Sequence, residues 1–346
     1  MRPESRVIAE WLAKRGSLDW VRHTLLVGRV NRAREWLQGH RWAVVAIQVT
    51  ALVILFAFFY WAFRDAWHEA KPLLREADLS DVFISMVILA AYYLLFAVAW
   101  QRMLAAWGLE IPYLVALQAE MASILAKYVP GTVWIPAARI AALRRFGVRD
   151  TPLVLASMLL EAGLSGLAGV LVFFVSLISV GFSAAPALPL LLLGVIAAVG
   201  LHPRIFTPGI RRLLRPFGGA DLPPLPYSTL VGLLGYYCLT WIIGGAALFF
   251  LMRSLGANPS LADIPYLGGV AAVSAIVAFL SLITPSGLGV REATMYGLLL
   301  AITTKGVALG VTVLNRLTIT AVEGLLLLAA ALAWRFLPRP EPETDP

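Results

Sequence analysis

Eight charged side chains lie within apolar stretches of the sequence, and their types and spacing could support chemistry. They are Glu120, Lys127, Arg139, Glu161, Arg291, Glu292, Arg316 and Glu323. The planar guanidinium of arginine matches the oxygens of a phosphate group, and a carboxylate within a membrane can relay a proton. An isolated charge at the centre of a bilayer costs on the order of 3 kcal/mol. We therefore expect these side chains to form ion pairs or to face water.

The cations and the carboxylates have different predicted roles. The residues that we predict to bind the phosphate or headgroup of a lipid are Arg291, Arg316, Lys127 and Arg139. The carboxylates that we predict to line a cavity, where they pair with cations or carry a proton, are Glu161, Glu292, Glu323 and Glu120. An alternative stays open for Lys127 and Arg139, because cations near a membrane surface commonly extend their side chains to it.

The charged residues near the carboxyl end also allow two interpretations. Arg316 and Glu323 are seven residues apart on one predicted helix, so roughly 10 Å separates them along its axis. Because that distance is too long for a direct pair, their partners should come from the two segments that are predicted below to form hairpins. Arg291 could bind an anion, or Arg291 and Glu292 could simply hold their segment against Glu323 and Arg316.

Two stretches that contain proline and glycine interrupt the apolar sequence. The first contains Pro130 and Gly131, and the second contains Pro285, Gly287 and Gly289. Proline removes a backbone donor and glycine permits angles that other residues resist, so helices should break at both places. Inside a bilayer, a broken helix is tolerated only where protein buries it or where it lines a wet cavity. We therefore predict a re-entrant helical hairpin at each break.

The composition is that of an integral membrane protein. Of 346 residues, 60% are hydrophobic and 14% are charged, and the mean hydropathy is +0.81. In soluble domains, roughly a quarter of the residues are charged. The single cysteine, Cys238, excludes an intramolecular disulfide, the four histidines are far apart, and no phosphate-binding loop, dinucleotide fingerprint or zinc-ligand spacing occurs. We expect no cofactor, no metal ion and no nucleic-acid partner.

The apolar runs predict an all-α polytopic membrane protein with six full transmembrane helices and two re-entrant hairpins. A basic leader, residues 1–41, precedes the membrane part, and a polar tail, residues 335–346, follows it. The predicted spans are 42–63, 82–100, 153–180, 187–201, 228–252 and 306–334, and the predicted hairpins occupy about 111–146 and 265–303. A membrane-crossing helix needs roughly 20 apolar residues, so 187–201 is the weakest of the six.

The predicted topology has opposite orientations in its two halves. With a cytoplasmic amino terminus, 20 of the 28 Lys and Arg residues fall in cytoplasmic segments and five in outer loops, as the positive-inside rule expects. Both termini are then cytoplasmic. Residues 42–180 and 187–334 become an inverted repeat, and inverted repeats whose broken helices meet at mid-membrane are typical of transporters. A hairpin that crossed the membrane fully would reverse every later segment.

The stretches around the two breaks resemble the signature of a known family. Residues 284–293, Thr-Pro-Ser-Gly-Leu-Gly-Val-Arg-Glu-Ala, together with residues 127–131, Lys-Tyr-Val-Pro-Gly, and Arg139 are similar to the lysylphosphatidylglycerol synthase transmembrane-region family. The resemblance covers about residues 42–335. Ser286 stands where the family usually has a second glycine.

The resemblance implies a flippase-like fold with two re-entrant hairpins around a central cavity. It also implies a substrate such as an aminoacylated phospholipid or a lipid-linked sugar. The bifunctional members carry a soluble aminoacyl-transferase domain after the membrane part, whereas this sequence has twelve residues after Trp334. We therefore expect a transporter and not an enzyme.

These observations lead to two hypotheses of function. The first is a lipid translocase, a flippase or scramblase of a bacterial or archaeal inner membrane. It would move an anionic, aminoacylated or polyprenyl-phosphate-linked lipid through a central polar cavity. The second is a non-transporting membrane subunit that positions a separate glycosyltransferase or aminoacyl-lipid synthase. Membrane lipids are partners in both, and a homo-oligomer is compatible with either.

Overall fold

The computed structural model describes the chain from residue 67 onward, with gaps. The described residues are 67–127, 134–178, 204, 208–209, 212, 225–281, 287 and 289–333. All of them lie in the second of the two units into which the chain divides, residues 62–346. Several predicted features lie outside the described residues: the leader 1–41, the spans 42–63 and 187–201, the tail 335–346, and Pro130, Gly131 and Pro285.

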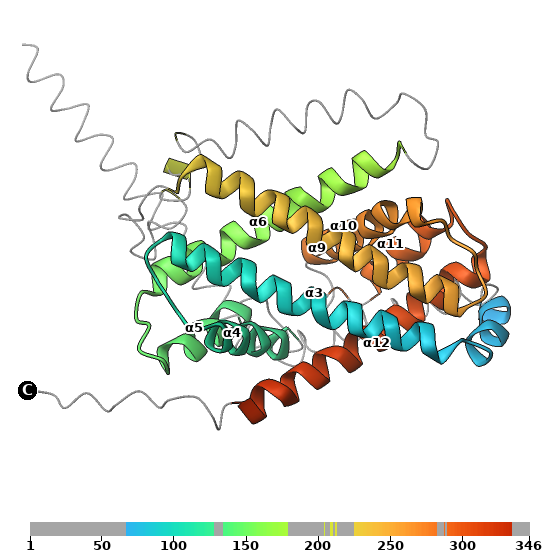
Figure 1. Ribbon diagram of the computed structural model, residues 1–346, viewed down its shortest axis with the longest axis horizontal. Coiled ribbons are helices and arrows are strands. Elements are labelled where there is room, and N and C mark those ends of the chain that lie inside the picture. Colours follow the sequence, from blue (N-terminus) through green and yellow to red (C-terminus); the bar gives the residue numbers. More distant parts are fainter. Residues whose placement is uncertain are drawn as a thin grey trace, which may run out of the picture. The chain divides into compact units, whose positions relative to one another are not determined.

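The described part of the chain is helical and contains no strand (Figure 1). Four long helices correspond to predicted spans: α3 (Leu79–Ala106), α6 (Thr151–Ser176), α9 (Tyr227–Ser254) and α12 (Lys305–Ala333). Each is long and apolar enough to cross a membrane. Helix α3 begins three residues before the predicted span because Asp78 caps it, accepting a hydrogen bond from the backbone N–H of Ser80 at 2.8 Å.

A fifth helix of this kind was predicted as part of a hairpin. The segment Leu261–Leu280 consists of a 3₁₀ turn, η2 (Leu261–Asp263), and helix α10 (Ile264–Leu280), and by length and composition it could cross a membrane by itself. It is followed by α11 (Val290–Leu299), which has only ten residues. The number of six spans, the re-entrant hairpins and the inverted repeat therefore stay predictions.

Two short helices fill the first predicted hairpin, residues 111–146. They are α4 (Tyr113–Ala126), with 14 residues, and α5 (Trp134–Arg144), with 11. At a rise of about 1.5 Å per residue, neither reaches across a hydrocarbon core of about 30 Å. The two helices pack against each other, α4 also packs against α3 and α12, and α5 also packs against α6. A pair of short, adjacent helices is what a hairpin in this region requires.

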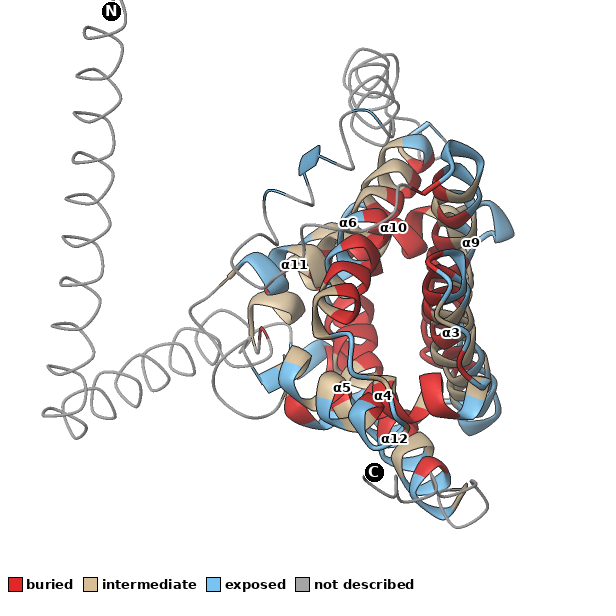
Figure 2. Cartoon of the chain, turned by 90° about the vertical axis from the view of Figure 1, so that its left-hand side faces the viewer, coloured by how far each residue is buried: buried red, intermediate tan, exposed pale blue. Residues whose placement is uncertain are grey.

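The core lies where α9 packs against α3, α6 and α10 (Figure 2). Small residues allow helices to pack closely, and Gly169 on α6 does so. A Cβ atom on Gly169 would come within 2.5 Å of the Cβ of Ala272 on α10. The neighbouring Gly163 and Gly166 have nothing within 4 Å of such an atom, whereas Gly269 on α10 packs on the backbone of Phe173, whose Cα would lie 2.5 Å from the same kind of atom.

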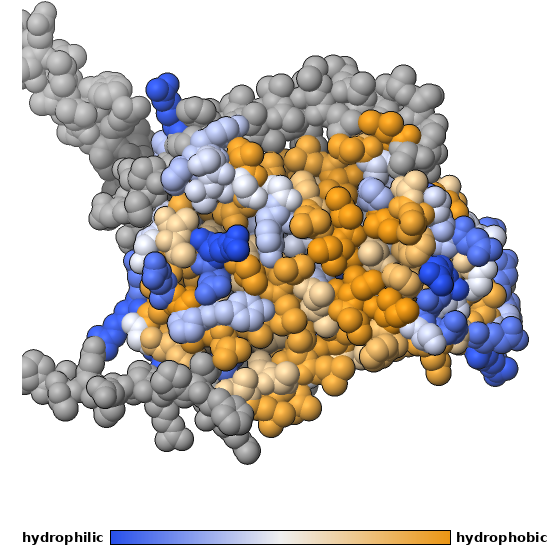
Figure 3. All heavy atoms as spheres, in the orientation of Figure 1, coloured by the Kyte–Doolittle hydropathy of each residue, from blue (hydrophilic) through white to orange (hydrophobic). Residues whose placement is uncertain are grey.

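The outer surface of the helices is apolar. Phe83 on α3 and Leu325 on α12 are among the large hydrophobic side chains that remain exposed. In Figure 3, apolar residues cover the middle of the visible face, and hydrophilic residues gather toward its two ends. An exposed apolar surface of this extent is typical of a protein whose solvent is lipid.

Candidate functional site

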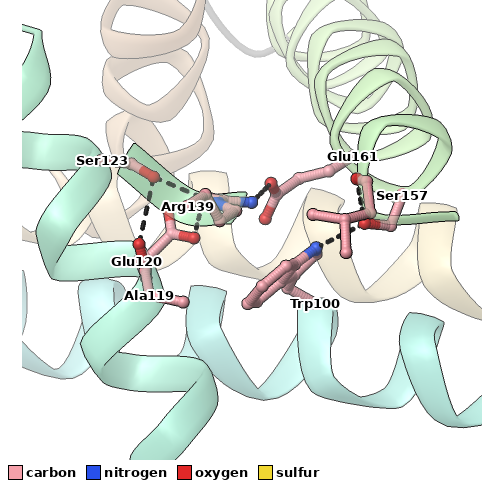
Figure 4. Close-up of polar contacts among 8 residues, drawn as sticks. Trp100, Ala119, Glu120, Ser123, Arg139, Ser157 and Glu161 are labelled. Carbon is pink, nitrogen blue, oxygen red and sulfur yellow. Dashed lines mark hydrogen bonds and ion pairs between the residues drawn. The ribbon is translucent and has the colours of Figure 1, made fainter. Parts of the chain in front are cut away.

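Arg139 on α5 is only 3% exposed and uses all three nitrogens of its guanidinium (Figure 4). Its Nη1 donates to Oε2 of Glu161 at 2.5 Å, and its Nη2 forms an ion pair with Glu120. Its Nε donates to Oγ of Ser123 at 3.1 Å. The guanidinium carbon also lies 4.3 Å from the centroid of the Trp100 ring, a cation–π contact. We call Glu120, Arg139 and Glu161 the Arg139 cluster.

Four helices position this cluster. Glu120 and Ser123 are three residues apart on α4, so they lie on the same face of that helix. Ser157 lies one turn before Glu161 on α6, and its Oγ accepts a hydrogen bond from Nε1 of Trp100 on α3 at 3.0 Å. Arg139 contributes the contact from α5. The cluster therefore fastens the two short helices to two of the long ones.

The Arg139 cluster has one negative charge in excess when all three groups are ionised. It contains two carboxylates and one guanidinium, and all of them are largely removed from water. Oε1 of Glu161 is buried and has no hydrogen-bond partner among the described residues. Burying a charge or an acceptor without a partner is costly. The cluster thus retains one unused acceptor atom and one uncompensated charge.

A second group of charges gathers around Glu323 on α12, which is 1% exposed. Lys127, at the carboxyl end of α4, forms an ion pair with Oε1 of Glu323. The hydroxyl of Tyr93 on α3 donates to the same oxygen at 2.5 Å. The Lys127 side chain is 25% exposed. The partners of Glu323 thus include a cation, which remains partly accessible, and a hydroxyl donor.

Glu292 holds the start of α11 and faces Arg316 on α12. Its Oε2 accepts a hydrogen bond from the backbone N–H of Gly289 at 2.7 Å, as in a capping box. Its Oε1 lies 3.6 Å from Nη1 of Arg316, so this ion pair is loose. Gly287 and Gly289 adopt φ angles of +65° and +85°, which confirms the prediction that the backbone here needs glycine.

Arg291 lies near these groups, but its Nε forms no hydrogen bond with them. Its Nε is buried and has no hydrogen-bond partner among the described residues. The charges of Arg291 and Arg316 both act on Lys127, and the charge of Arg291 also acts on Tyr92 and Tyr93. Three cations from different segments thus face one region. The cation site, as we call it, comprises Lys127, Arg291, Arg316, Glu292 and Glu323.

Comparison with known families identifies the chain. Residues 48–337 match the model of the lysylphosphatidylglycerol synthase transmembrane region. The chain belongs to this family. No curated protein gives a significant match to the sequence. Membership in the family and the five long apolar helices together make this a multi-pass membrane protein, and the matched residues include the Arg139 cluster and the cation site.

The family's second motif, residues 284–293, contributes two members of the cation site. The prediction that Arg316 and Glu323 find partners on other segments is confirmed, because Arg316 faces Glu292 and Glu323 pairs with Lys127. The alternative interpretation was that two ion pairs hold this motif in place, Glu292 with Arg316 and Arg291 with Glu323. The structure contains the first of these contacts. The partner of Glu323 is Lys127, and Nε of Arg291 stays unmatched.

The family's first motif extends from Lys127, and the two cations of this region have different surroundings. Arg139 is buried and paired, so an extended side chain at the membrane surface is the wrong interpretation for it. Lys127 is partly exposed but is directed to Glu323. The binding of a lipid headgroup by Lys127, Arg139, Arg291 and Arg316 stays a prediction.

Four uncharged residues at these sites were not predicted from the sequence. Tyr92 and Tyr93 lie together in the apolar helix α3, where a pair of hydroxyl groups was a usable signal. Trp100 and Ser123 gave no comparable signal, because aromatic and small polar residues are common throughout these helices. Their role depends on which helices are neighbours.

Proposed function

We propose that this member of the family is a lipid translocase. The observation that carries the proposal is the charge of the cation site. Among the described residues, its three cations face two carboxylates, and Nε of Arg291 has no hydrogen-bond partner. The side chains of Lys127 and Arg316 each keep 25% of their exposure. A lipid phosphate would supply the missing negative charge, and the fork of an arginine matches its oxygens.

The substrate is an anionic, aminoacylated or polyprenyl-phosphate-linked lipid of a bacterial or archaeal inner membrane. Its headgroup occupies a central polar cavity at the cation site, while its hydrocarbon chains remain in the bilayer. The two hairpins, residues 111–146 and 265–303, enter from opposite sides as parts of an inverted repeat. Movement of one repeat against the other exposes the site to each side in turn. The protein moves the lipid and does not modify it.

The position of the cation site between segments supports this mechanism. Its members come from the end of α4, the start of α11 and the middle of α12, and Lys127 and Glu323 are 196 residues apart in the sequence. A site assembled from separate segments changes its geometry when those segments move relative to each other. A site within a single helix would not respond in this way.

The test is lipid movement in liposomes that contain the purified protein. Labelled phosphatidylglycerol and a labelled polyprenyl-phosphate sugar are the probes, and the rate is compared with that of empty liposomes. We expect Arg291→Ala to lower the rate about tenfold or more, the effect of losing about 1.4 kcal/mol. Arg253→Ala is the matched control, because Arg253 is an exposed arginine that pairs with Asp81 at 3.4 Å, outside the cation site.

Two results would count against this function. The first is no acceleration over empty liposomes for either class of lipid. The second is equal rates for Arg291→Ala and Arg253→Ala. Full cellular function of Arg291→Ala and Arg316→Ala, with a lipid-modifying enzyme that co-purifies with the chain, would instead favour a subunit that positions that enzyme.

A further inference from the structure

We propose that the Arg139 cluster is a proton-binding site in which Glu161 takes the proton, and that this proton is the coupling ion of the translocase. The existence of the site is independent of lipid transport, whereas its role in coupling rests on the proposed function. Three features support it: the charge of the cluster, the surroundings of Glu161, and the link from the cluster to the cation site.

The charge of the cluster calls for one more positive charge. The side chains of Glu120, Arg139 and Glu161 are only 13%, 4% and 9% exposed. One guanidinium compensates one carboxylate, and a second buried carboxylate next to it is disfavoured both by desolvation and by the charge of its neighbour. When one carboxyl binds a proton from water, the cluster becomes neutral. No bond other than that O–H bond has to form.

Glu161 is the carboxyl whose surroundings suit a proton. Its Oε2 is occupied by Arg139, while its Oε1 is buried and has no partner among the described residues. The hydroxyl of Tyr237 on α9 is fully buried and equally without a partner, and it interacts electrostatically with Glu161. A phenol hydroxyl can accept a hydrogen bond from a protonated carboxyl or donate one to a carboxylate. Among the described residues the two side chains do not bond each other, so Tyr237 is a buried hydroxyl near Glu161 that a protonated Oε1 could engage.

Among the described residues, the charged and titratable groups that face Glu161 come from four neighbouring helices. They are Tyr92 on α3, Glu120 on α4, Arg139 on α5 and Tyr237 on α9. Helix α10 also packs against α6, but its only titratable side chain, Tyr266, donates its hydroxyl to the carbonyl of Leu298. Arg139 is thus the single cation of this group, and the negative charge of Glu120 repels that of Glu161.

Glu323 and metal ions offer weaker alternatives. Glu323 has a cation and a hydroxyl donor of its own, Lys127 and Tyr93, so its charge is already compensated. A calcium or magnesium ion needs six or more oxygen ligands. Among the described residues, no group of three or more His, Cys, Asp or Glu side chains is arranged to hold a metal ion. A proton needs one unused oxygen, which Glu161 has.

Helix α4 links this cluster to the cation site. Glu120 and Lys127 are seven residues apart on it, so about 10 Å separates the two sites along the axis. Tyr92 on α3 is close enough to both sites to interact electrostatically with Arg291 of one and with Glu120 and Glu161 of the other. An anionic headgroup at the cation site adds negative charge near Glu161 and therefore strengthens proton binding. By linkage, the proton strengthens headgroup binding equally, by on the order of tenfold at an effective dielectric constant of about 20.

Infrared difference spectroscopy of the full chain in lipid nanodiscs tests the proton site without any transport. We expect a carboxyl C=O band that appears as the pH is lowered and that shifts when glutamate is isotopically labelled. The band should be lost in Glu161→Gln and retained in Glu323→Gln. Tyr237→Phe, which keeps every charge, should shift its frequency. A wild-type spectrum with no such band, or a band that persists unchanged in Glu161→Gln, overturns the proton site.

Transport in liposomes then tests the coupling. Labelled phosphatidylglycerol and polyprenyl-phosphate sugar are again the probes, and their rates are measured with and without a pH gradient. In the wild type we expect the gradient to change the rate severalfold, and in Glu161→Gln the ratio of the two rates should fall to one. A wild-type rate that ignores the gradient overturns the coupling role. If no lipid moves but the Glu161 band is present, the translocase is refuted and the proton site stands.

Discussion

Two arginines of the predicted hairpins, Arg139 and Arg291, have opposite surroundings. Arg139 is buried, and each of its three nitrogens has a partner. Arg291 is partly exposed, and its buried Nε has no partner among the described residues. An arginine whose three nitrogens all have partners in its own protein has little left for a ligand, whereas a buried donor without a partner is costly unless a ligand completes it. The two residues therefore have different proposed tasks.

The net charge around Arg139 also differs from that around Arg291. Counted over the residues that the structure describes, the Arg139 cluster has an excess carboxylate, and the cation site has an excess cation. The first is a place for a proton, and the second is a place for an anion. Charge type alone does not distinguish a structural arginine from a binding arginine, because both occur in apolar segments with glutamates nearby.

The largest effect that we predict is on stability, for Arg139→Ala. This change leaves Glu120 and Glu161 together in a buried site without a cation, and removal of one partner from a buried ion pair costs about 3–5 kcal/mol. The free energy of unfolding in mixed micelles measures it. Arg253→Ala removes an exposed ion pair and should cost under about 1 kcal/mol. Equal losses in the two variants would contradict the buried role of Arg139.

A smaller effect separates the two glutamates. Glu323→Gln removes the charge that pairs with Lys127, so we expect a loss of about 2 kcal/mol, typical of a hydrogen bond to a charged group. Glu161→Gln removes an excess charge while Arg139 keeps Glu120, so its loss should be under about 1 kcal/mol. The same unfolding measurement compares the two. The reverse order would show that the charge balance of the Arg139 cluster is misjudged.

Arg291→Ala should affect transport while leaving stability almost unchanged. We expect a rate of lipid movement about tenfold lower, equivalent to about 1.4 kcal/mol, and a change in unfolding free energy under about 0.5 kcal/mol. The liposome assay and the unfolding measurement are made on the same preparation. Loss of stability as large as that of Arg139→Ala would make Arg291 a structural residue and remove the contrast between the two arginines.

A modest effect on stability is expected for Tyr93→Phe. The change removes the hydroxyl that donates to Glu323 but keeps the ion pair with Lys127 and the volume of the ring. We expect a loss of about 1 kcal/mol in the free energy of unfolding. A loss of more than about 3 kcal/mol would mean that the hydroxyl and not Lys127 compensates the charge of Glu323.

Class and local structure could be predicted from the sequence because they depend on neighbouring residues. Hydropathy over about 20 residues identified the membrane helices, and α6, α9 and α12 lie where they were predicted. Gly287 and Gly289 indicated the break before α11, because positive φ angles are a property of the single residue. The cost of an isolated charge predicted that Glu161 and Glu323 would find partners.

The tertiary structure alone decided which partners these are. Arg139 meets Glu120 and Glu161 because α5 packs between α4 and α6, and Lys127 meets Glu323 because α4 packs against α12. The sequence contains no periodicity across such distances, since helix adjacency is set by side-chain packing and not by local spacing. For the same reason, the unmatched oxygen of Glu161 and the unmatched nitrogen of Arg291, on which both proposals rest, become visible only once the helices are in place.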